Sequence, residues 1–79
     1  MTVRLRFFAT LREQLGTSIE REVPRGTTVE SLWEAVVAER PSLRRLHVSF
    51  AVGERYVEGS HRVKAGDEVA FFPPVSGGC

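Results

Sequence analysis

Only one segment of this chain combines the apolar spacing and the length of a substantial helix, and it limits the folds that remain. Its apolar side chains recur three or four positions apart, as they do on one face of an α-helix; they are Val29, Leu32, Trp33, Val36 and Val37. Thr27 and Thr28 are candidate N-caps, and Glu30 follows Thr27 at capping-box spacing. Pro41 disfavours helical geometry at Arg40. We therefore expect one main helix that ends near Arg40.

The segments on both sides of this helix alternate between apolar and polar side chains, which is typical of strands that are buried on one face. The expected strands are residues 2–8, 18–23, 48–52, 56–57 and 68–72. A short helix of about two turns is expected over residues 9–15, because Gly16 stands where a left-handed helix C-cap would lie.

This order of strands around one long helix predicts an α+β chain with a β-grasp, ubiquitin-like fold. In this fold a mixed sheet of four or five strands packs on the main helix, and the first and last strands are central, parallel neighbours. The predicted core consists of Val3, Leu5, Phe7, Val29, Leu32, Val36, Val48, Phe50, Val69 and Phe71. A chain of 79 residues supports only one core. We expect residues 1–72 to form one domain and residues 73–79 to form an extended, flexible tail.

Two aromatic side chains are predicted on the sheet face that the main helix does not cover. Phe8 falls on the polar side of the first strand, and Phe72 falls on the polar side of the last. If these strands are neighbours, the two rings form a small exposed patch beside the root of the tail. Exposed apolar patches commonly mark partner sites. Alternatively, the short helix over residues 9–15 covers both rings.

The tail, residues 73–79, reads Pro-Pro-Val-Ser-Gly-Gly-Cys. Pro73 cannot donate a hydrogen bond to a sheet, and Pro74 restricts Pro73 to extended geometry, so the last strand must end there. At about 3.3 Å per residue, residues 73–78 reach roughly 20 Å beyond the domain. Gly77 and Gly78 lack Cβ atoms, so they can enter a narrow slot and bring a carbonyl group to another protein's reactive centre.

Composition excludes several classes of function. The net charge is +1, from 11 Lys and Arg against 10 Asp and Glu, which does not suit a nucleic-acid-binding protein. No apolar run approaches the length of a membrane span, and we expect a cytoplasmic protein. The two histidines are isolated, and there is no Cys/His cluster or phosphate-binding glycine loop. We therefore expect no metal, no bound cofactor and no catalysis by this chain alone.

Two stretches of sequence resemble a known family. They are Phe-Phe-Ala, Leu-Arg-Glu and Gly within residues 7–16, and Gly-Asp-Glu-Val-Ala-Phe-Phe-Pro-Pro-Val-Ser-Gly-Gly over residues 66–78. The chain thereby resembles the small, sulfur-carrying subunit of molybdopterin synthase, the MoaD-type branch of the ubiquitin-like sulfur carriers. The thiamine branch of these carriers usually lacks the double proline.

The resemblance implies that the Gly78 carboxylate is adenylated by an E1-like enzyme with ATP and converted to a thiocarboxylate by a sulfur donor. The tail residues Val75, Ser76, Gly77 and Gly78 then enter the large synthase subunit, where the sulfur passes to a pterin precursor. The docking residues for the large subunit would be Phe8, Arg12, Phe72, Pro73 and Pro74. Alternatively, Arg12 is only a solvated helix residue.

Cys79 departs from the family pattern, in which the chain ends at the second glycine. An amide-linked Gly78 has no carboxylate to activate, so three interpretations remain open. A peptidase removes Cys79 first, which we favour; the protein uses its cysteine thiol; or it carries no sulfur. The same tail also suits a carrier for thiamine, tRNA thiolation or cysteine synthesis, and a modifier that links Gly78 to lysine on a target protein. A pure interaction domain would not need the tail.

Overall fold

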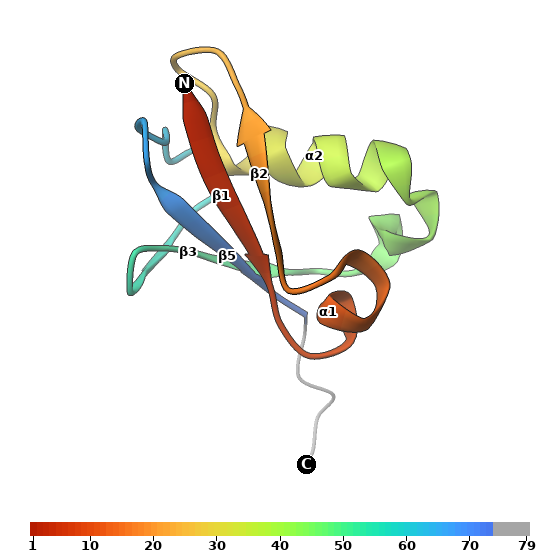
Figure 1. Ribbon diagram of the computed structural model, residues 1–79. Helices are drawn as coiled ribbons and strands as arrows, with labels where there is room; N and C mark the ends of the chain where they lie inside the picture. The colour runs from red at the N-terminus through yellow and green to blue at the C-terminus, as the bar shows by residue number, and fades with distance from the viewer. Residues whose placement is uncertain (74–79) are drawn as a thin grey trace.

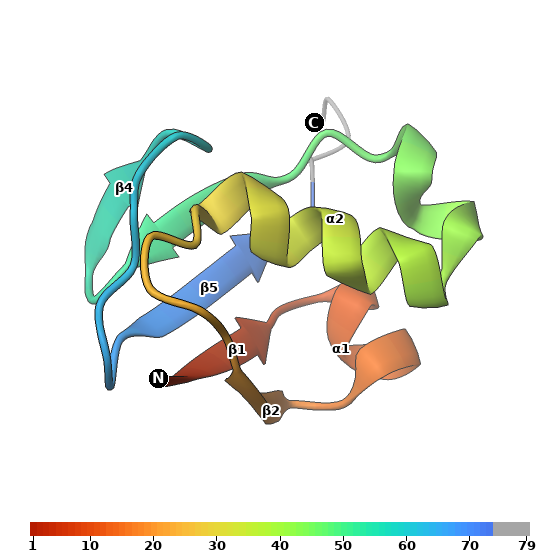
Figure 2. The same ribbon diagram turned by 90° about the horizontal axis from the view of Figure 1, so that it is seen from above.

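The computed structural model describes residues 1–73, in which five strands form one mixed sheet and helix α2 lies across one face (Figures 1 and 2). The elements in chain order are β1 (Thr2–Phe7), α1 (Thr10–Leu15), β2 (Ser18–Glu22), α2 (Val29–Glu39), the 3₁₀-helix η1 (Pro41–Arg45), β3 (Ser49–Val52), β4 (Arg55–Val57) and β5 (Glu68–Phe72). The predicted β-grasp fold is confirmed, and the strands differ from the expected ranges only at their ends. The 3₁₀-helix was not predicted.

The strand order in the sheet is β2-β1-β5-β3-β4. β1 and β5 are parallel, with Leu5 opposite Val69 and Phe7 opposite Phe71, as the sequence predicts for the first and last strands. The other three pairs of neighbours are antiparallel. Figure 1 shows β1 and β5 side by side, so the first and last strands are neighbours inside the sheet. Because they are parallel, the start of β1 and the end of β5 lie at opposite edges of the sheet.

The core lies between the sheet and α2, and eight of the ten predicted core residues are buried. Val48 and Phe50 are only partly buried and pack against the core from its margin. Val48 precedes β3, and β3 lies next to the edge strand β4, which is only three residues long. The core also contains buried side chains that the prediction omitted, namely Leu11, Trp33, Val37, Leu43 and Val63.

The capping box predicted from Thr27 and Glu30 is wrong. The N-cap of α2 is Thr28, whose hydroxyl oxygen accepts a hydrogen bond from the Ser31 N–H at 3.2 Å. The Thr27 hydroxyl instead donates to the carbonyl oxygen of Pro24 at 2.6 Å. Thr27 therefore stabilises the turn before α2, while Thr28 caps the helix itself.

The loop after β4 supplies the remaining acceptors at the start of α2. The Val29 N–H donates to the His61 carbonyl and the Glu30 N–H donates to the Gly59 carbonyl, both at 2.9 Å. These bonds satisfy helix donors that have no partner within the helix. Gly59 lies so close to α2 that a Cβ atom there would be 3.1 Å from the Cβ of Glu30. This loop fixes the position of the helix relative to the sheet.

Both ends of α1 have a positive φ angle. Gly16 has φ 89° and ψ 176°, so it is not the left-handed helical C-cap that was predicted, although its N–H still donates to the Arg12 carbonyl. Ala9, before the helix, has φ 54° and ψ −131°. Among the described residues, Ala9 is the only non-glycine with a positive φ. The turn between Phe8 and α1 is therefore strained.

Candidate functional site

The sheet face opposite α2, called here the outer face, has an apolar part beside the end of β5 and a charged part beside the start of β1. Strand register places Ala70 between Arg6 and Ala51, and places Ala51 opposite Tyr56. Since side chains on one face alternate along a strand, Phe72 and Phe8 follow on the same face. The apolar part of the outer face therefore comprises Phe8, Ala51, Tyr56, Ala70 and Phe72.

Phe8 and Phe72 are brought together, as strand parity predicts. Their ring centroids are 4.7 Å apart and the rings are nearly parallel, at 13°. Each side chain is partly buried rather than fully exposed. Helix α1 buries Leu11 in the core, on the other side of the sheet. The two rings thus form a half-exposed stack at the root of the tail, where β5 ends.

Tyr56 extends this stack, and sequence reasoning missed it. Its side chain is 76% exposed, and its ring centroid lies 5.9 Å from that of Phe72. Among the described residues it is the only large hydrophobic side chain that is classed as exposed. β4 has only three residues, too few for alternation to show which face Tyr56 occupies. One feature of the sequence could have identified Tyr56: it is an aromatic residue in a strand that is bordered by charged residues.

Arg6 and Glu68 border the apolar part of the outer face. The Arg6 guanidinium lies 5.2 Å from the centroid of the Phe8 ring, and its nitrogen lies 3.6 Å from a Glu68 carboxylate oxygen. Together with the apolar residues they surround a depression of about 310 Å³, which is lined by Arg6, Phe8, Ala51, Gly53, Glu54, Tyr56, Glu68, Ala70 and Phe72. The outer face is therefore hollowed beside the aromatic stack.

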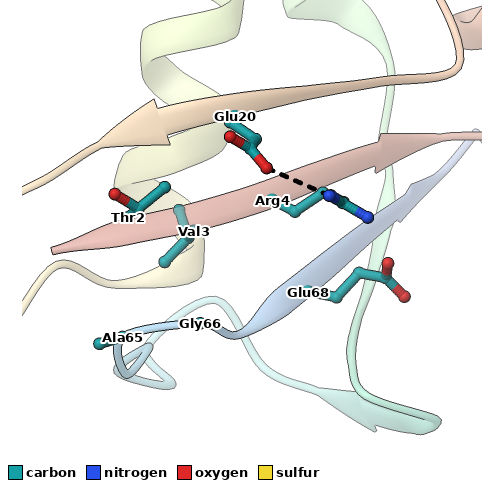
Figure 3. Close-up of a pocket in the computed structure, with 7 residues that line it drawn as sticks. All are labelled: Thr2, Val3, Arg4, Glu20, Ala65, Gly66 and Glu68. Atoms are coloured by element: carbon teal, nitrogen blue, oxygen red, sulfur yellow. Dashed lines mark hydrogen bonds and ion pairs between the residues drawn. The ribbon is translucent and has the colours of Figure 1, made fainter.

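The charged part of the outer face pairs its own charges. Figure 3 shows Arg4 of β1 reaching Glu20 of β2, at 3.1 Å, with Glu68 on the neighbouring strand β5. The Thr2 hydroxyl likewise donates to the Glu22 carboxylate. These side chains are largely exposed, so each pair contributes at most about 1 kcal/mol to stability. Its charges already have partners within this chain. They are therefore less available for contacts with a docking protein than the side chains of the apolar part are.

Arg12 and Pro73 are close in sequence to the two residues of the aromatic stack. Arg12 is exposed on α1, and Pro73 is partly buried directly after β5. Phe7 pairs with Phe71, and Ser49 pairs with Phe72. The chain therefore leaves the sheet between the segment that follows β1 and the segment that precedes β3. The other predicted tail residues, Pro74, Val75, Ser76, Gly77, Gly78 and Cys79, lie outside the described residues.

Within residues 1–73, no group of three or more His, Cys, Asp or Glu side chains could hold a metal ion. In the same part of the chain, no helix is long and apolar enough to cross a membrane.

Comparison with known proteins relates the whole domain to one family. The model of the ThiS family matches residues 5–78. The molybdopterin synthase sulfur carrier subunit of Escherichia coli is 36% identical over 80 residues, which cover 96% of this chain and 99% of that protein. The human protein of the same name is 34% identical, over 96% of this chain and 93% of its own length. The crystal structure of SAMP1 from Haloferax volcanii is similar with a TM-score of 0.80 and 29% identity, covering 99% of this chain and 100% of that one. The chain belongs to the ThiS family.

Proposed function

We propose that this protein is the sulfur carrier subunit of a molybdopterin synthase. It is the non-catalytic, sulfur-donating member of a sulfurtransferase complex and works in the cytoplasm. The main structural support is the Phe8–Phe72 stack, which stands at the root of a Pro-Pro-Val-Ser-Gly-Gly sequence. Relatives that are 34% to 36% identical over nearly the whole chain have this name. In this proposal residues 1–72 are the docking domain and residues 73–79 are the tail.

The reactive group in this proposal is the carboxylate of Gly78. A carboxylate is a poor electrophile, so an E1-like enzyme first joins it to AMP from ATP and releases pyrophosphate. A sulfur nucleophile from a sulfurtransferase then attacks the acyl carbon, a C–S bond forms, and AMP leaves with the electron pair of the C–O bond. When the donor delivers this sulfur from a persulfide, a thiol then attacks the donor's sulfur, so that a disulfide forms between that thiol and the donor and the thiocarboxylate leaves. Glycine suits this position because it leaves the acyl carbon unhindered.

The apolar part of the outer face is the proposed docking surface for the large subunit. Phe8, Tyr56 and Phe72 supply three aromatic rings, and aromatic anchors commonly dominate binding energy at interfaces. Pro73 and Pro74 continue this surface toward the tail residues Val75, Ser76 and Gly77. Arg12, exposed on α1, is proposed as a charged contact at its edge.

Cys79 must be removed before Gly78 can react, because Gly78 is otherwise an amide. We assign this step to a processing peptidase. The step is tested by comparing the full-length chain with a chain truncated after Gly78, each incubated with the cognate E1-like enzyme and ATP. The truncated chain should release pyrophosphate and, with a sulfur donor, gain the mass of one oxygen-to-sulfur exchange. The proposal is wrong if the full-length chain is activated equally fast while mass spectrometry shows that Cys79 is still attached.

A second candidate is a protein modifier, because the chain is also 29% identical to SAMP1 and is similar in structure to the H. volcanii small archaeal modifier protein 1. A modifier forms an isopeptide bond between its glycine and a target lysine. Cell extract that contains isopeptide-linked species of this chain, and no thiocarboxylate form, would favour the modifier. A carrier for another sulfur acceptor would form the thiocarboxylate but would fail to bind the large synthase subunit.

A further inference from the structure

We propose that the depression in the outer face receives one apolar side chain of the docking protein, with a basic side chain of that protein beside it at Glu54. The inference rests on the proposed function, in which the large synthase subunit docks on this face. It adds the chemistry that the partner must present there: an apolar residue next to a lysine or arginine.

The floor of the depression is formed by two small residues. Ala51 and Ala70 are paired in register on β3 and β5. Both lie on the face that α2 leaves open, yet they are only 6% and 8% exposed. The longer side chains around them, including Phe72 and Tyr56, therefore rise above the alanine floor and shield it. A larger residue at either position would fill the space.

The size of this space suits a side chain rather than a free ligand. Its volume of about 310 Å³ is at the lower end of the range for small-molecule sites, and it is open on one side. The wall is aromatic at Phe8, Tyr56 and Phe72 and charged at Arg6, Glu54 and Glu68. The aromatic side and the alanine floor favour an aliphatic or aromatic group, because such a group removes apolar surface of both proteins from water. One side chain that projects from a partner surface meets these requirements.

The rim of the depression is net negative. Arg6 is paired with Glu68 and lies over the Phe8 ring, so its charge is largely balanced. Glu54 is exposed in the turn between β3 and β4, and no salt bridge in residues 1–73 includes it. The chain as a whole has a net charge of +1, so this local excess is not a general property of its surface. A cation of the partner is therefore the complementary group.

The tail makes the docking protein the occupant of this depression. The six residues from Pro73 to Gly78 span at most about 20 Å. When Gly78 reaches a reactive centre inside the partner, the end of β5 at Phe72 is held within about 20 Å of that centre. Since Phe72 itself lines the depression, the docking surface proposed around Phe72 includes the depression.

The test is calorimetric titration of the large synthase subunit from the same organism with the wild-type chain and five variants, of which Phe72→Ala tests the docking face itself. Ala51→Leu fills the depression, and Glu54→Lys reverses the charge at its rim. The matched controls are Ala35→Leu and Glu34→Lys, because both positions are exposed on α2, on the other side of the sheet. Thermal unfolding, followed through Trp33, verifies that each variant is folded.

Ala51→Leu should weaken binding at least about tenfold at both low and high salt, because the apolar side chain can no longer enter. Glu54→Lys should weaken binding about five- to tenfold at low salt, and this loss should shrink at high salt, where charges are screened. The controls should bind like the wild type. Glu54→Lys keeps the inference testable if Ala51→Leu fails to fold.

The inference is overturned if Phe72→Ala weakens binding while Ala51→Leu and Glu54→Lys bind like the wild type. That result would leave the proposed docking face in place and remove the depression from it. If neither the full wild-type chain nor the chain truncated after Gly78 binds the large subunit, the proposed function fails, and this inference fails with it.

Discussion

Two adjacent phenylalanines on β5 should separate stability from docking. Phe71 is fully buried and contacts Phe7, Trp33 and Phe50, with ring centroids 5.5 to 5.7 Å away. Replacing a buried Phe by Ala costs about 3–5 kcal/mol, a large share of the 5–15 kcal/mol that stabilises a typical domain. We therefore expect Phe71→Ala to lower the free energy of unfolding severely.

Phe72→Ala should change stability little and weaken binding of the large subunit strongly. It removes a half-buried ring and its stack on Phe8, and aromatic pairs contribute about 0.5–1.5 kcal/mol beyond burial, so the domain should remain folded. At the interface an aromatic anchor typically contributes about 2 kcal/mol or more, so affinity for the large subunit should fall at least about thirtyfold.

The two variants are compared by urea unfolding, monitored through Trp33 fluorescence, and by calorimetric titration with the large subunit. Trp33 is a suitable reporter because its ring lies 5.5 Å from that of Phe71 in the core. Phe8→Ala serves as a second docking variant, since Phe8 stacks on Phe72 from the neighbouring strand. Unchanged affinity in Phe72→Ala would refute the assignment of the docking surface, even if the stability results agree with expectation.

Three further changes test other parts of the structure. Leu32→Ala should lower the free energy of unfolding by about 2–5 kcal/mol in urea titrations, because Leu32 is only 3% exposed; a loss below about 1 kcal/mol would contradict its place in the core. Gly59→Ala should cost about 1–3 kcal/mol, since its Cβ would be 3.1 Å from that of Glu30; a higher melting temperature would show that the loop adjusts freely. Gly78→Ala in the truncated chain should lose most pyrophosphate release while the melting temperature stays the same; full activity would show that the enzyme's slot tolerates a Cβ atom.

Periodicity predicted those parts of the fold in which apolar side chains recur at a regular spacing over several residues. Alternation over residues 2–8 and 68–72 gave both central strands and put Phe8 and Phe72 on one face, and the structure agrees. Helical spacing from Val29 to Val37 gave α2 to within one residue of its end. In each case the buried face repeats often enough that a single register satisfies the pattern.

Short elements and tertiary contacts were beyond this reasoning. The three residues of β4 contain too little alternation to orient Tyr56, and an alanine gives no sign that its neighbours bury it. Thr28, and not Thr27, is the N-cap of α2. A long-range contact is found at Thr27, whose carbonyl accepts a hydrogen bond from the Val63 N–H. Such a contact joins segments more than thirty residues apart, so no local pattern predicts it.

The pairing of β1 with β5 links the core to the proposed docking surface. One register brings Phe7 onto Phe71 inside the sheet, at 5.7 Å, and the next residues bring Phe8 onto Phe72 outside it, at 4.7 Å. The outer rings are therefore held by backbone strands whose inner side chains are among the most buried of the described residues. An anchor that is already fixed loses less conformational freedom when it binds, so more of its contact energy appears as affinity. Since β5 ends at Phe72, the strand that fixes the anchor also fixes the point from which the tail departs.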